Sequence, residues 1–257
     1  MAAREAIDGQ VIMLRRPEMA AVHVSCVLMK RLRDRLCPPG GVFVDIGAHI
    51  GSVIAAVQRY SAPSQIIAFE AIPEKVERLR AKFPGVEIHQ CALGERAGEV
   101  EFTIDLVETG NSSLNTAVQG RSAAHKVISV EMQTLDHLMG GHRVDLMKID
   151  VEGAELGVLR GGETTIADQR PLIVFESGAE EMEGYPRRDL FDWFQARDYD
   201  LVTPSRLAHT APPATWEVFA DAHQYPFITW DWFAVPREKR SEVRRCAARI
   251  MSNGARQ

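Results

Sequence analysis

The chain has 257 residues, of which 46% are hydrophobic and 25% are charged, and its formal net charge is −5. This is the composition of an ordinary globular protein, long enough for one large α/β domain or two small ones. The acidic balance argues against a nucleic-acid partner, and four scattered cysteines without a Cys-x-x-Cys pair argue against a disulfide framework. The apolar run Met19–Met29 is too short to span a bilayer, and the charged residues before it are unlike a signal peptide. We therefore expect a cytoplasmic protein with no membrane span.

The first part of the chain alternates strands with helices, which predicts a parallel, doubly wound sheet. Residues 1–41 are expected to form a preamble, whose helix the run Cys37–Gly41 stops. In chain order, the expected elements are a strand at Gln10–Leu14, a helix at Met19–Leu36, a strand at Val42–Ile46, a helix at Ser52–Tyr60, a strand at Gln65–Glu70, a helix at Pro73–Lys82 and a third core strand at Val86–Leu93.

The alternation breaks between Gly94 and Gln133. Glu99–Ile104 and Lys126–Gln133 both have the pattern of strands, and the stretch between them is polar and rich in Gly, Asn and Ser. Long loops of this kind are often functional. We therefore expect a β insertion after the third strand, with a loop beside the ligand site.

The regular pattern then resumes and continues to residue 236. The expected elements are a short helix at Thr134–Met139, a strand at Asp145–Asp150, a helix at Glu152–Arg160, a strand at Pro171–Glu176, a helix at Arg187–Arg197 and strands at Tyr199–Thr203 and Trp230–Val235. Residues 42–236 would thus form one domain around a seven-stranded, mostly parallel sheet. Residues 237–257 would form a basic helical tail that docks on the protein's own surface or at a subunit contact.

The turn after the first core strand is the first candidate for chemistry. In Asp45-Ile46-Gly47-Ala48-His49-Ile50-Gly51 the glycines permit positive φ angles or a close backbone approach. Asp45 would repel a pyrophosphate, but it suits the cationic amino-acid part of S-adenosylmethionine (SAM). Glu70, at the end of the second strand, can accept hydrogen bonds from ribose hydroxyls. Together these residues predict a SAM site.

A second cluster of charged residues follows the strand Asp145–Asp150. Lys148, Asp150 and Glu152 alternate with apolar residues at the carboxyl end of a central strand, where α/β sheets bind ligands. Because burying unpaired charge is costly, acids at this place indicate a functional site. The structural alternative is that Lys148 pairs with one of the acids while Glu155 favours a helix N-terminus.

At this point the chain resembles the FkbM family of methyltransferases, whose members typically O-methylate sugars in glycans and natural products. The resemblance spans residues 42–178, and it implies a Rossmann-like, class I methyltransferase fold. The ordered motifs that carry it are Asp45–Gly51, Phe69-Glu70, Ala92-Leu93-Gly94, Gly110-Asn111-Ser112-Ser113-Leu114, Thr134-Leu135-Asp136 and Lys148–Glu155.

The resemblance also implies roles for individual residues. The turn residues Asp45, Gly47, Ala48 and Gly51 would line the methionine part of SAM, Glu70 the ribose, and Ala92 and Leu93 the adenine. Ser113 would belong to a loop near the reacting centre, and Asp150 and Glu152 would face the acceptor. The chain departs from the family pattern at His49, usually Asn, and at Ala71, usually Pro.

Methyl transfer to a sugar hydroxyl needs in-line positioning and a general base. Asp150 and Glu152 are the first candidates for the base, and His49 is the third. If the two carboxylates lie close together, repulsion raises one pKa toward neutrality. A divalent ion such as Mg²⁺, held by Asp150, Glu152 and the acceptor, is the alternative, since oxygen ligands suit it. The metal ligands themselves are left unassigned.

Other functions stay open from the sequence. They are an N-methyltransferase acting on a small-molecule amine, an NAD-dependent oxidoreductase on a similar sheet, and a SAM-binding module without turnover. The missing Gly-x-Gly-x-x-Gly argues against the oxidoreductase. The acceptor is expected to be a small molecule or a glycan, and self-association into a homo-oligomer is left open.

Overall fold

The computed structural model describes residues 15–106, 125–178 and 184–253. The expected strand at Gln10–Leu14 and the loop residue Ser113 lie outside these ranges. The strands of the main sheet are β1 (Val42–Ile46), β2 (Gln65–Glu70), β3 (Glu87–Gln90), β7 (Leu146–Ile149), β8 (Leu172–Glu176), β9 (Tyr199–Val202) and β10 (Asp231–Pro236).

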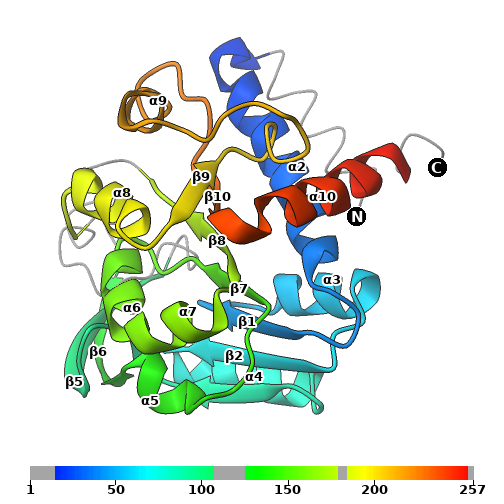
Figure 1. Ribbon diagram of the computed structural model, residues 1–257. Coiled ribbons are helices and arrows are strands. Elements are labelled where there is room, and N and C mark those ends of the chain that lie inside the picture. Colours follow the sequence, from blue (N-terminus) through cyan, green and yellow to red (C-terminus); the bar gives the residue numbers. More distant parts are fainter. Residues whose placement is uncertain (1–14, 107–124, 179–183, 254–257) are drawn as a thin grey trace.

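These seven strands lie in the order β3-β2-β1-β7-β8-β10-β9. The pairs from β3 to β8 are parallel, whereas β10 runs antiparallel to both β8 and β9. The predicted mostly parallel, doubly wound sheet with seven strands is therefore confirmed. Figure 1 shows the sheet passing through the middle of the molecule, with helices around it.

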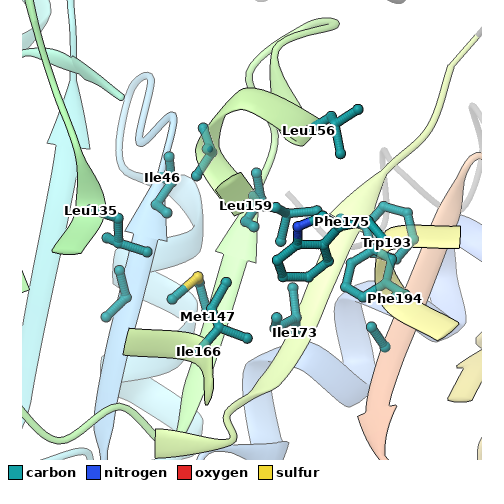
Figure 2. Close-up of a cluster of buried hydrophobic side chains, with 14 of the residues drawn as sticks. Ile46, Leu135, Met147, Leu156, Leu159, Ile166, Ile173, Phe175, Trp193 and Phe194 are labelled. Carbon is teal, nitrogen blue, oxygen red and sulfur yellow. The ribbon is translucent and has the colours of Figure 1, made fainter. Parts of the chain in front are cut away.

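Side chains along a strand point alternately to the two faces of the sheet. Because the central strands are buried along their whole length, both faces are apolar. Val44 and Ile46 belong to one buried cluster and Phe43 to the other. Figure 2 shows part of the first cluster, where Trp193 and Phe194 pack beside Phe175. Helices α5 (Leu135–Met139), α6 (Glu155–Gly161), α7 (Glu163–Gln169), α8 (Arg187–Gln195) and α9 (Trp216–Asp221) contribute to the first cluster, and α2 (Ala20–Leu36), α3 (Ser52–Tyr60), α4 (Pro73–Lys82) and α10 (Arg240–Asn253) to the second.

The third core strand differs from the prediction. Val86–Leu93 was expected as one strand, but the chain leaves the main sheet after Gln90. β4 (Ala92–Leu93) joins β5 (Gly98–Asp105) and β6 (His125–Gln133) in a separate sheet with the order β4-β6-β5. Gly94 allows this close pairing, because a Cβ there would lie 2.5 Å from Met132 Sδ. The β insertion itself is confirmed.

One helix prediction also needs correction. The helix expected at Glu152–Arg160 begins only at Glu155, because Glu152 and Gly153 adopt φ angles of 53° and 91°. Gly162 is both the C-cap of α6 and the N-cap of α7. Helices α7 and α9 were not predicted.

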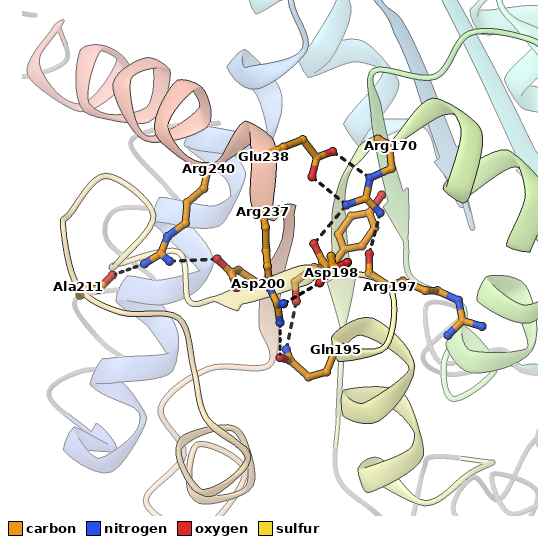
Figure 3. A network of polar contacts seen from close by, with 10 residues as sticks. Arg170, Gln195, Arg197, Asp198, Asp200, Ala211, Arg237, Glu238 and Arg240 are labelled. Carbon is orange, nitrogen blue, oxygen red and sulfur yellow. Dashed lines mark hydrogen bonds and ion pairs between the residues drawn. The ribbon is translucent and has the colours of Figure 1, made fainter.

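The basic tail packs on the chain itself. Arg31 of α2 donates a hydrogen bond to the carbonyl of Ile250 in α10 at 3.0 Å. The 3-10 helix η5 (Arg237–Lys239) places Arg237 2.7 Å from Asp198 and 3.3 Å from Asp200 (Figure 3). The chain's own acids thus neutralise part of the tail's positive charge. In the parts of the chain that the structure describes, no helix has the length and apolarity needed to cross a membrane.

Candidate active site

A cavity lies at the carboxyl ends of β1, β2 and β7, with about 550 Å³ of empty space when its open mouth is included. Its walls are mostly apolar, and Phe69, Ile72 and Phe102 contribute to them. Seven of the predicted site residues line it, namely Gly47, His49, Glu70, Ala92, Leu93, Asp150 and Glu152. The structure thus brings the two sequence clusters, from the first turn and from the end of β7, to one place.

Gly47 brings the two clusters together. Its φ angle is 78°, and a Cβ at this position would lie only 2.0 Å from the carbonyl oxygen of Asp150. The amides of Gly47 and Ala48 both donate to the carbonyl of Phe69 at 3.0 Å. A side chain at position 47 would therefore force the turn after β1 away from the end of β7.

Glu70 is held by main-chain amides. Its Oε2 accepts from His49 N at 2.8 Å, and its Oε1 accepts from Ile72 N at 2.9 Å. Burial raises the pKa of this carboxyl group, and the two amide hydrogen bonds oppose that rise. The carboxylate therefore has a fixed orientation at the wall of the cavity.

Lys148 is a buried cation between the two turns. Its Nζ lies 3.4 Å from Asp45 and 3.2 Å from Asp150, and it donates to the carbonyls of Ile46 and Gly47 at 3.2 and 2.7 Å. Burial alone would lower its pKa, but the two carboxylates outweigh that effect and raise it. Asp45 is completely buried, and burial raises its pKa. Asp45 therefore contacts Lys148 and is not among the residues that line the cavity.

Three carboxyl groups gather where β7 and β8 end. Oxygen atoms of Asp150, Glu152 and Glu176 all lie within 4.8 Å of one another. Burial, followed by the charges of Asp150 and Glu155, raises the pKa of Glu152 to about 8. Burial and Asp150 also raise the pKa of Glu176 well above its ordinary value. The cluster therefore holds protons at neutral pH, and Glu152 can exchange one with a neighbouring group.

Glu176 was missed by the sequence interpretation, although a signal for it existed. Like Glu70, it is the last residue of a core strand, and the carboxyl ends of parallel strands meet at one edge of the sheet. A prediction that placed Glu70, Asp150 and Glu176 together at this edge of the sheet would have been stronger.

His49 lies in the left-handed region with a φ angle of 51°, and it lines the cavity. Burial lowers its pKa first, and the positive charges of Lys75 and Lys148 lower it further. His49 is therefore a neutral imidazole at neutral pH, which can accept a proton, but the pKa of Glu152 matches that task better.

Of the predicted cofactor residues that the structure describes, Asp45, Ala48 and Gly51 are not among those that line the cavity. Ala48 is buried and is not among the lining residues. Gly51 precedes α3 with a φ angle of 75°, and a Cβ there would lie 2.3 Å from Phe83 Cε2. Gly51 is thus needed for packing of the turn against the end of α4. All the predicted cofactor contacts, those of Asp45, Ala48 and Gly51 included, stay predictions.

Comparison with known proteins gives a consistent result. The family model described as the methyltransferase FkbM domain matches residues 45–201. "Methyltransferase 1" of Beauveria bassiana (strain ARSEF 2860) is 29% identical over 167 residues, which cover 56% of this chain and 67% of that protein. The "2-O-methyltransferase NoeI" of Sinorhizobium fredii (strain NBRC 101917 / NGR234) is 26% identical over 172 residues, which cover 60% of this chain and 71% of that protein. Among solved structures, methyltransferase FkbM from Methylobacillus flagellatus KT matches 76% of this chain and 43% of its own chain, with 15% identity and a TM-score of 0.49.

Proposed function

Because this chain belongs to the FkbM family of methyltransferases, we propose that it methylates a hydroxyl group of a sugar or glycosylated metabolite, with SAM as methyl donor and a carboxylate as general base. The observation that carries this proposal is the position of Glu152, a carboxyl group with a pKa of about 8 at the wall of the cavity that Glu70 also lines. The name of the relative NoeI, a 2-O-methyltransferase, supports a hydroxyl acceptor.

The cavity suits SAM in three respects. The fixed carboxylate of Glu70 offers acceptors for ribose hydroxyls, and Leu93 and Phe102 offer an apolar wall for adenine. Gly47 leaves main chain, and no side chain, at the inner end of the cavity. Bound there, SAM supplies an electrophilic methyl group, and Asp150 and Glu152 line the same cavity.

Glu152 fits the part of general base. A sugar hydroxyl is a weak nucleophile, so it gains from a proton acceptor whose pKa lies near the working pH. Oδ2 of Asp150 is already engaged by Lys148 Nζ at 3.2 Å. We therefore assign proton acceptance to Glu152 and orientation of the acceptor hydroxyl to Asp150, with the pKa of Glu152 raised first by burial and then by the charges of Asp150 and Glu155.

The alternatives from the sequence fit less well. An amine among three carboxylates would be stabilised as its ammonium ion, which has no free electron pair for attack. Family membership also gives no support to an NAD-dependent oxidoreductase. Mg²⁺ remains a testable variant of the proposal, since carboxylate oxygens are the ligands that it prefers.

Calorimetric titration of the purified chain with SAM, its demethylated product and NAD is the first test. We expect SAM and its product to bind and NAD to give no heat, with binding weakened in Glu70→Ala. A panel of sugars, glycosylated metabolites and matched amines is then incubated with SAM, and methylation is read as mass gain, with Mg²⁺ and with a chelator. Hydroxyl products that disappear in Glu152→Gln, while SAM still binds, would support the proposal. Methylated amines alone, or an unchanged rate in Glu152→Gln, would overturn it.

A further inference from the structure

The turn that carries Glu152 is closed by the carboxylate of Glu155. Oε1 of Glu155 accepts from Val151 N at 3.1 Å and from Gly153 N at 3.3 Å, so the two amides on either side of Glu152 bind one oxygen. Glu155 is 2% exposed. Between those amides, Glu152 has a φ angle of 53°, a conformation that costs a non-glycine residue free energy. The carboxylate of Glu155 thus holds Glu152 in an unfavourable backbone conformation.

The other oxygen of Glu155 is bound from a different part of the chain. Tyr185, two residues before α8, donates its hydroxyl to Glu155 Oε2 at 2.9 Å. Beside it, the amide of Gly184 donates to the carbonyl of Gly153 at 3.0 Å. Two hydrogen bonds therefore join residues 184–185 to the turn at Glu152, and one of them ends on a buried carboxylate.

We propose that Glu155 and Tyr185 are positioning residues, and that their hydrogen bond holds the Glu152 carboxyl group in the place from which it takes the acceptor's proton. This inference rests on the proposed function. We call the pair the Glu155–Tyr185 latch. Neither residue touches the acceptor in this assignment, because Glu155 is buried beneath the turn and its oxygens are bound by the amides and by Tyr185.

The latch also sets the electrostatic surroundings of Glu152. Four charged groups face Glu152. They are Lys148 in β7, Asp150 directly after β7, Glu155 in α6 and Glu176 in β8. Burial raises the pKa of Glu155, and hydrogen bonds from the Val151 amide and from the hydroxyl of Tyr185 oppose that rise. The charge of Glu155 in turn raises the pKa of Glu152. Loss of the Tyr185 hydroxyl should therefore lower the pKa of Glu152, both by weakening that charge and by letting water reach the turn.

The test uses Tyr185→Phe, with Tyr199→Phe as a matched control. Tyr199 likewise donates a hydroxyl hydrogen bond, to the carbonyl of Pro171 at 3.1 Å, but it lies in β9. The titration of Glu152 is followed by carbon-13 NMR of labelled glutamate carboxyls, and its signal is assigned by its absence in Glu152→Gln. Initial rates, measured with an acceptor that the panel described under the proposed function identifies, give kcat and the KM for SAM. Glu155→Gln, whose amide nitrogen cannot accept from Tyr185, serves as a second variant.

We expect the midpoint of the Glu152 titration to fall below about 8 in Tyr185→Phe and in Glu155→Gln, and to stay unchanged in Tyr199→Phe. We expect kcat in Tyr185→Phe to fall by about 10- to 100-fold, since small misplacements of a catalytic group have such effects, with an unchanged KM for SAM. An unchanged titration midpoint in a folded latch variant would overturn the inference. If the wild-type chain binds no SAM, the proposed function falls, whereas the NMR titration still decides whether the latch sets the surroundings of Glu152.

Discussion

Replacement of Lys148 by methionine tests how the two halves of the site are joined. Lys148 Nζ contacts Asp45 and Asp150 and donates to the carbonyls of Ile46, at the end of β1, and of Gly47, in the turn after it. Methionine has a similar length and fits an apolar surrounding, but it removes all four polar contacts. Asp45, completely buried, then remains in the core without its cation.

The magnitude follows from that burial. Removal of one partner from a buried ion pair costs about 3–5 kcal/mol, because the other charge is left without compensation. A domain is typically stable by about 5–15 kcal/mol, so the loss is a large part of the total. If the cost comes from Asp45, the double variant Asp45→Asn/Lys148→Met should regain most of it. A coupling energy of about 2 kcal/mol or more is expected, within the range seen for contacting residues.

The stability of Lys148→Met should also depend on pH. Burial already raises the pKa of Asp45 above the 3.8 of an unfolded aspartate, and loss of Lys148 raises it further. The folded variant therefore keeps a proton that the unfolded chain releases, so its free energy of unfolding falls as pH rises above that value.

Urea unfolding at pH about 6 and about 8 measures the wild type, both single variants and the double variant. Lys126→Met, at an exposed position in β6, is the control for the change of residue type. A coupling energy near zero would refute the reasoning, because Lys148 and Asp45 would then contribute independently.

The rate of methyl transfer to a hydroxyl should rise with pH through a midpoint near 8, because only ionised Glu152 accepts a proton; a pH–rate profile beside that of Glu152→Gln checks this. Glu70→Gln should weaken SAM binding by about 1–3 kcal/mol, since an amide nitrogen replaces one acceptor; calorimetry measures the loss. Gly51→Ala should lower stability by about 1–3 kcal/mol, because its φ is 75° and a Cβ would meet Phe83. Thermal unfolding compares it with Gly85→Ala, where a Cβ has no neighbour within 4 Å.

Each of these expectations has a contrary result. A rate that falls as pH rises above 7 would assign the base role to another group. Equal SAM affinity in Glu70→Gln would remove the ribose assignment from Glu70. A Gly51→Ala variant as stable as Gly85→Ala would mean that the turn tolerates a Cβ, and that packing against Phe83 does not explain the glycine.

Much of the main sheet was readable from the sequence because its strands are buried on both faces. Val42–Ile46 and Gln65–Glu70 are short apolar runs that end at an acid or a glycine turn, and both were predicted with their observed bounds. By contrast, the departure of the chain from the main sheet after Gln90 has no turn residue to mark it. The pairing of Ala92 with Met132 causes it, and no local pattern contains that contact.

The difference between local sequence patterns and tertiary contacts also explains which parts of the site were predicted and which were not. The cavity residues Gly47, Glu70 and Asp150 follow from the rule that ligands bind at the carboxyl ends of strands. The position of Asp45 does not, because it depends on the register that pairs Asp45 with Lys148 across β1 and β7. A charge at a strand end can contact a ligand or a neighbouring strand, and only the tertiary pairing decides between them.

The position of β10 has a consequence for how the chain is made. β10 follows β9 in the sequence but lies between β8 and β9 in the sheet. During synthesis, the edge of β8 therefore has no strand beside it on that side until residues 231–236 have left the ribosome. An apolar strand such as Leu172–Glu176 with an open edge can pair with other chains. The nascent protein thus depends on its last strand to cover the part of the sheet where a stray chain would bind.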